Sequence, residues 1–124
     1  MAYSTTFTNH LSHPRNVGEL ENANASAEES NPSCGDRMRL TLIISDGRIV
    51  EARYRAYGCP PTLVCGSVLT DLIKGKTTED AKSITKEDIV EAAGGIPSRK
   101  RHAAALALET LLAALSSKAA NAEE

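Results

Sequence analysis

Two stretches in the first half of the chain alternate apolar and polar residues, which is the period of a strand with one buried face. In residues 37–45 the apolar positions are Met38, Leu40, Leu42 and Ile44. In residues 50–57 they are Val50, Ala52, Tyr54 and Ala56. Because Asp46-Gly47 between them is a common hairpin turn, we predict that the two strands pair antiparallel. A weaker alternation over residues 23–27 predicts a third strand at the sheet edge.

The helical period marks both ends of the chain. Near the N-terminus, one helical face carries Tyr3, Phe7, His10 and Leu11. Pro14 and Gly18 end this segment, so we predict a short docked helix in which His10 and the nearby His13 are structural. A second helix is predicted over about residues 62–74, after a proline pair and before Gly75. Its apolar face comprises Val64, Val68, Leu69, Leu72 and Ile73.

Three further helices are predicted from their start signals. Thr77 with Asp80, and Thr85 with Asp88, have the spacing of helix N-caps, and Gly94-Gly95 ends the second of these short helices. Ser98 is expected to cap the last helix. The apolar stripe of that helix is Leu108, Leu111, Leu112 and Leu115, with His102 on its flank.

This order of elements predicts one α+β domain spanning residues 1–124. We expect a small antiparallel sheet of about three strands with helices packed on one face. The polar, alanine-rich residues 116–124 are expected to fray. A fold of this kind names no function by itself.

Composition excludes several classes of partner. A formal charge of -2 gives no broad cationic field, so nucleic acid is not expected to be a partner. The N-terminus does not resemble a signal peptide, and no stretch approaches the roughly 18 apolar residues of a membrane span. We therefore expect a cytoplasmic protein that does not engage a membrane. In a reducing compartment its three cysteines are expected to be free or metal-bound.

The predicted hairpin brings candidate metal ligands to one end of the sheet. Cys34 precedes its first strand and Cys59 follows its second, so both thiols are expected at the same rim. Asp36 and His102 add an oxygen and a nitrogen donor, and thiolate with imidazole suits iron and zinc. Each residue has a plainer interpretation, because cysteine also packs as a small apolar side chain, aspartate shapes a strand start and histidine flanks a helix. An enzyme with a cysteine nucleophile and His102 as its base is disfavoured, because the sequence contains no recognisable oxyanion motif.

Several motifs, in order along the chain, resemble one known family. They are His13-Pro14-Arg15-Asn16-Val17-Gly18, Asn31-Pro32 with Cys34-Gly35-Asp36, Tyr54 with Tyr57-Gly58-Cys59, Leu69-Thr70 with Gly75-Lys76-Thr77, and Lys100 with His102. Together they are similar to the U-type iron-sulfur cluster assembly scaffolds, IscU and the NifU N-terminal domain. The resemblance covers residues 3–115.

The resemblance implies a scaffold, not an enzyme, on which a [2Fe-2S] cluster or iron is held and then passed on. Carried over residue by residue, it assigns cluster binding to Cys34, Asp36, Cys59 and His102. The family's third cysteine, which follows the histidine, is replaced here by Ala103. Since iron-sulfur clusters are held chiefly by thiolates, we hypothesise that Cys65 supplies the missing ligand. Its place near a helix N-terminus is expected to acidify its thiol.

The resemblance also implies partners. Such scaffolds receive sulfur from a cysteine desulfurase and deliver clusters to recipient apo-proteins, and many present a short segment to an Hsp70/J-type chaperone. That segment corresponds here to residues 96–100, in which Ile96, Pro97 and Lys100 are the candidate contacts. The lost thiol leaves two alternatives open, a Zn²⁺-binding sulfur-relay protein of the SufU kind and a degenerate regulatory paralogue of the scaffold.

Overall fold

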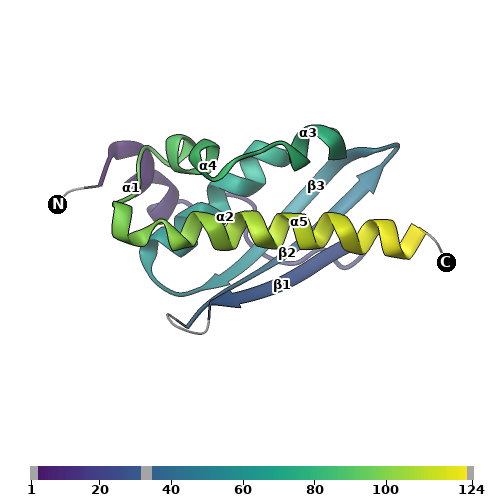
Figure 1. Ribbon diagram of the computed structural model, residues 1–124, viewed down its shortest axis with the longest axis horizontal. Helices are drawn as coiled ribbons and strands as arrows, with labels where there is room; N and C mark the ends of the chain where they lie inside the picture. Colours follow the sequence, from purple (N-terminus) through teal and green to yellow (C-terminus); the bar gives the residue numbers. More distant parts are fainter. Residues whose placement is uncertain (1–2, 32–34, 123–124) are drawn as a thin grey trace.

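The computed structural model describes residues 3–31 and 35–122, with side chains up to Ser117. Its elements in chain order are α1 (Thr5–Ser12), β1 (Ala25–Asn31), β2 (Asp36–Ser45), β3 (Arg48–Tyr57), α2 (Pro60–Ile73), α3 (Thr78–Lys82), α4 (Lys86–Ala92), a 3₁₀ turn η1 (Ser98–Lys100) and α5 (His102–Ala122). The three strands form one antiparallel sheet in the order β1-β2-β3. Helices α2 and α5 lie across one face of that sheet (Figure 1). The α+β prediction is confirmed.

The β2–β3 hairpin has the predicted turn but not the predicted alternation throughout. Met38, Leu40, Leu42 and Ile44 face the core as expected. The ladder slips between Ile43 and Ile44, so Ile44 pairs with Ile49 and Val50 is pushed out of the alternation. Ile49 is fully buried and Val50 is 48% exposed, which reverses the prediction for Val50. A bulge of this kind exchanges the two faces of a strand within one residue.

The core lies between the sheet and the helices. Phe7 from α1, Leu40 from β2, Leu69 from α2 and Leu111 from α5 are all fully buried within it. Because the chain has few aromatic residues, aliphatic side chains fill most of this space. Among the helices of the described residues, none is long and apolar enough to cross a bilayer.

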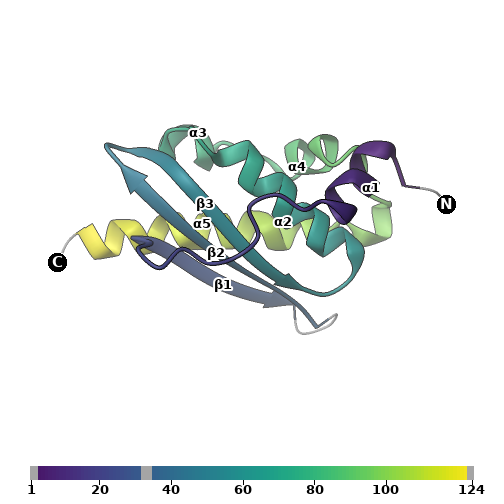
Figure 2. The same cartoon turned by 180° about the vertical axis from the view of Figure 1, so that it is seen from behind.

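The N-terminal segment touches both faces of the sheet. On the helix side, the Tyr3 ring stacks on the fully buried Phe7 ring, and the imidazole of His10 bonds Ser67 on α2. The chain then pairs residues 16–18 with the edge of β3 and runs over the opposite face, as Figure 2 shows. The strand predicted from residue 23 begins at Ala25 and continues to Asn31.

The short helices begin as predicted, and the last helix does not. Thr77 caps α3, and Thr85 forms a reciprocal capping box with Asp88 on α4. Ser98, expected to cap the last helix, opens the 3₁₀ turn instead, and α5 begins at His102. Leu112 is 41% exposed, because alanines and Thr110 share the buried face with Leu106, Leu111 and Leu115. The helix continues to Ala122, so fraying after residue 116 stays a prediction.

Candidate metal centre

Hairpin closure places the start of β2 beside the end of β3. Arg37 pairs with Tyr57 in the ladder, so Asp36 and Cys59 lie just beyond the last paired residues. The Cys59 backbone N–H donates to Asp36 Oδ1 at 3.3 Å. Two residues that stand 23 positions apart in the sequence are therefore in direct contact.

Cys59 is held at the rim by the prolines that follow it. A residue before proline avoids the helical region, and Cys59 has an extended backbone with φ -73° and ψ 164°. It is the N-cap of α2, and Pro60 fills the first helical position, where no N–H is needed. The Cys59 side chain is half-buried, with Sγ 3.5 Å from Thr62 Oγ1. The thiol is thus fixed at the mouth of the site and still reachable from solvent.

Gly58 allows the close approach of the two strand ends. Its φ is +143°, a backbone conformation that side chains rarely adopt. A Cβ atom at this position would collide with the Asp36 carboxylate. This steric role could not be predicted from the sequence, in which Gly58 belongs to a motif at the end of a predicted strand.

His102 reaches the same point from the start of the last helix. It is the first residue of α5, and its Nε2 lies 3.1 Å from Asp36 Oδ2, with 25% of the His102 side chain exposed. One donor atom from each of Asp36, Cys59 and His102 falls within 4.8 Å of the other two. The structure therefore brings together three of the residues that the sequence singled out.

Asp36 is 2% exposed, so the protein and not water supplies the hydrogen-bond partners of its carboxyl group. It accepts the Cys59 N–H and faces the His102 ring. A sulfur, an oxygen and a nitrogen donor at this spacing suit zinc or iron, which bind thiolate, carboxylate and imidazole. The donor set fits a single transition-metal ion, and it leaves room in a tetrahedral shell for a further ligand.

Two predicted ligands are not part of this group of three. Cys34 lies outside the described residues, so its place in the site stays a prediction. Cys65 faces inward from the second turn of α2 and is fully buried in the core. Burial raises the pKa of its thiol to about 12, with the nearby Cys59 as a smaller cause. The expected acidification of Cys65 is therefore wrong, because loss of water outweighs the helix N-terminus.

The other predicted positions divide between core and surface. Ala103, next to His102, is fully buried. Of the residues expected to contact a chaperone, Ile96 is also buried, while Pro97 and Lys100 remain partly exposed on and beside the 3₁₀ turn. Thr62 was missed as a contact of Cys59, although its place three residues after an N-cap could have indicated it.

Known proteins are similar to this chain in sequence and in fold. Residues 2–123 match the family described as NifU-like N terminal domain. The chain is 37% identical over 113 residues to the iron-sulfur cluster assembly scaffold protein IscU 1 of Archaeoglobus fulgidus, covering 91% of this chain and 74% of that protein. It is 36% identical to IscU of Escherichia coli, covering 93% and 92%.

Solved structures agree on the architecture. The SUF-system protein FiSufU of Fervidobacterium islandicum superimposes with a TM-score of 0.75 at 24% identity, over 91% of this chain and 96% of that one. The N-terminal part of a NifU-like protein from Brucella abortus gives a TM-score of 0.60 at 17% identity, over 97% and 86%. At these identities the likeness supports the fold alone.

Proposed function

Because the chain belongs to the NifU-like N-terminal domain family, we propose that it is a scaffold for the assembly and transfer of iron-sulfur clusters. Its cargo is iron and a [2Fe-2S] cluster. The observation that carries the proposal is the convergence of Asp36, Cys59 and His102 on one point at the rim of the sheet. Relatives at 36–38% identity carry the name IscU, which supports the same assignment.

The ligand set that we propose is Cys34, Asp36, Cys59 and His102. Cys59 and Cys34 supply thiolates, which iron-sulfur clusters require. Asp36 supplies an oxygen, a weaker ligand for these metals, which suits a site that must release what it holds. Cys65 is a less favourable ligand than the sequence suggested, because its thiol is buried and hard to ionise.

We place the scaffold in the cytoplasm, with a cysteine desulfurase as sulfur donor and apo-proteins as recipients. It acts as a carrier and not as a catalyst. An Hsp70/J-type chaperone would meet Pro97 and Lys100, since Ile96 is turned into the core. These partners follow from the family and from the exposure of the segment.

A second candidate function is supported by Ala103. With alanine where the family's third cysteine stands, the donors near His102 amount to one sulfur, one oxygen and one nitrogen among the described residues. Such a set matches the tetrahedral Zn²⁺ sites of proteins as well as it matches a cluster. A zinc-binding sulfur-relay protein of the SufU kind is therefore the alternative.

Metal analysis followed by anaerobic reconstitution with iron and sulfide separates the two functions. The scaffold assignment predicts the visible absorption of a [2Fe-2S] centre, lost in Cys59→Ala and kept in Cys65→Ser. Ala103→Cys should lengthen the life of that centre, with Ala103→Ser as a control of similar size. Tight zinc without cluster uptake would favour the relay. A chain that holds neither metal would instead indicate the regulatory paralogue.

A further inference from the structure

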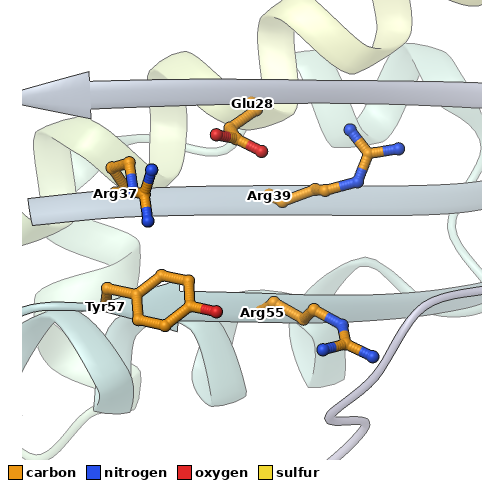
Figure 3. Close-up of a pocket in the computed structure, with 5 residues that line it drawn as sticks. All are labelled: Glu28, Arg37, Arg39, Arg55 and Tyr57. Carbon is orange, nitrogen blue, oxygen red and sulfur yellow. The ribbon is translucent and has the colours of Figure 1, made fainter.

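One face of the sheet is not covered by helices, and its open half carries a cluster of arginines. Arg37 and Arg39 stand on β2, and Arg55 and Tyr57 stand on β3; we call these four residues the arginine patch. Together with Glu28 of β1 they line a hollow of about 200 Å³. Figure 3 shows how the five side chains lie on the three strands. The segment that follows α1 covers the neighbouring half of this face, where Leu20 N–H donates to Thr41 Oγ1.

The charges of the arginine patch are only partly balanced within the chain. Arg39 and Arg55 are directly opposite each other in the ladder, an arrangement of like charges that destabilises a sheet. One carboxylate, Glu19, lies 3.3 Å from Arg39 and 3.7 Å from Arg55. Arg37 stacks 4.9 Å above the Tyr57 ring, and no carboxylate of the described residues lies within ion-pair distance of it.

The arginine patch adjoins the candidate metal centre. Arg37 follows Asp36 in β2, and Tyr57 precedes Gly58 and Cys59. Since side chains alternate along a strand, Asp36 turns to the helix side and Arg37 to the open side of the same rim. A protein bound on the open face would therefore lie next to the residues that hold the cargo.

We propose that the arginine patch docks a protein that presents clustered Asp and Glu carboxylates. This inference rests on the proposed function, and it deepens it by assigning an acidic face to a partner that approaches the metal centre. Arginine and tyrosine are enriched at the energetic centres of protein interfaces. Tyr57 is 58% exposed, an unusual state for an aromatic side chain in a chain with so few of them.

Charge complementarity favours a protein over other anions. Glu19 and Glu28 lie among the three arginines, so a uniform polyanion such as nucleic acid would be repelled at two points. A protein surface can place a carboxylate opposite Arg37 and a basic or neutral group opposite Glu28. Half-exposed arginines bind a small free anion weakly in water, whereas a docked protein excludes water and strengthens each pair.

The test measures binding to an apo-ferredoxin of the [2Fe-2S] type with strongly negative net charge, without iron or sulfide. Arg37→Glu with Arg55→Glu should weaken binding about tenfold or more. Arg37→Gln with Arg55→Gln, which removes charge without adding repulsion, should have a smaller effect in the same direction. Lys82→Glu with Lys86→Glu, on α3 and α4, is the control with the same change in net charge.

The outcomes are separable. The proposal holds if wild type and the control bind alike, with an affinity that falls as salt rises, and both arginine variants bind more weakly. It is overturned if the ferredoxin does not bind, if the control loses as much affinity, or if single-stranded DNA binds wild type more tightly than the ferredoxin does. Zinc affinity of the same variants is measured without ferredoxin, so loss of the metal centre is recognised independently of loss of docking.

Discussion

Cys59 stands at the start of α2 and Cys65 within it, and their surroundings differ completely. Cys59 caps the helix at the rim, half-buried, beside a carboxylate and an imidazole. Cys65 lies in the second turn of the helix and is fully buried among apolar side chains of the core. In our proposal only Cys59 of the two is a ligand, because the helix turns the Cys65 side chain into the core while Cys59 stays at the rim.

The largest difference between the two positions is expected when each thiol is removed. Cys59→Ala should lower zinc affinity by more than about 100-fold and leave the free energy of unfolding nearly unchanged, because a ligand is lost and no core contact is. Cys65→Ser should keep zinc affinity and destabilise the fold by about 1–3 kcal/mol, because a hydroxyl is buried without a partner. Competition titration with a zinc chelator and urea unfolding measure the two effects.

The control for this pair is Cys65→Ala, which removes the sulfur without adding a polar group. Equal losses of zinc affinity in Cys59→Ala and Cys65→Ser would show that Cys65 also binds the metal.

A glycine stands beside each cysteine, and the two glycines differ in what they contact. Gly58→Ala forces the Asp36 carboxylate aside, so zinc affinity should fall by about 10–100-fold. Gly66→Ala drives a methyl group into the Tyr54 ring, whose hydroxyl donates to the Leu63 carbonyl at 3.0 Å. That change should destabilise the fold by about 1–3 kcal/mol with little change in zinc affinity. The opposite pattern of effects would show that the two glycines have been assigned the wrong roles.

Reactivity separates the two thiols without mutation. In the native, metal-free protein, iodoacetamide should alkylate Cys59 and leave Cys65 unmodified. Only a thiolate reacts, and burial raises the pKa of Cys65 to about 12. In denaturant both should react. Peptide mass spectrometry resolves the sites, and rapid labelling of Cys65 in the native protein would contradict its place in the core.

The smallest expected effect concerns His10 of α1, which contacts Ser67 of α2, two residues after Cys65. Ser67 Oγ accepts the Arg15 N–H at 2.9 Å and lies within hydrogen-bond distance of His10 Nδ1, at 2.7 Å. Burial first, and then Arg15, lower the pKa of His10 from 6.5, while Asp71 raises it. The folded state thus binds a proton on His10 less readily than the unfolded state does.

Stability from His10 is accordingly present above about pH 6.5 and declines as the pH falls below that value. Urea unfolding at several pH values should show a small decline on the acid side that is weaker in His10→Gln. An equal decline in both proteins would assign the pH dependence to other groups.

Local patterns in the sequence predicted much of the fold. Strand alternation, the Asp46-Gly47 turn and the threonine caps of α3 and α4 depend on nearby residues, and each is confirmed. The exposure of Val50 could not be predicted, because the bulge that causes it depends on how β2 and β3 fit together. Ser98 was misplaced because a 3₁₀ turn and a helix start carry the same local signature.

The candidate site divides in the same way. The hairpin argument predicted which strand ends meet, and the family motifs predicted that His102 joins them. The role of Cys65 depended on the facing of a helix in the core, and the role of Gly58 depended on a contact with Asp36. Both roles depend on packing between segments that are distant in the sequence, so neighbouring residues alone cannot predict them.

Zinc K-edge absorption of the zinc-loaded protein shows directly whether Cys59 and His102 bind the metal. We predict one ion per chain with mixed sulfur and nitrogen or oxygen neighbours, losing sulfur in Cys59→Ala and an imidazole in His102→Ala, and unchanged in Cys65→Ser. A coordination shell that is the same in wild type, Cys59→Ala and His102→Ala would contradict this prediction.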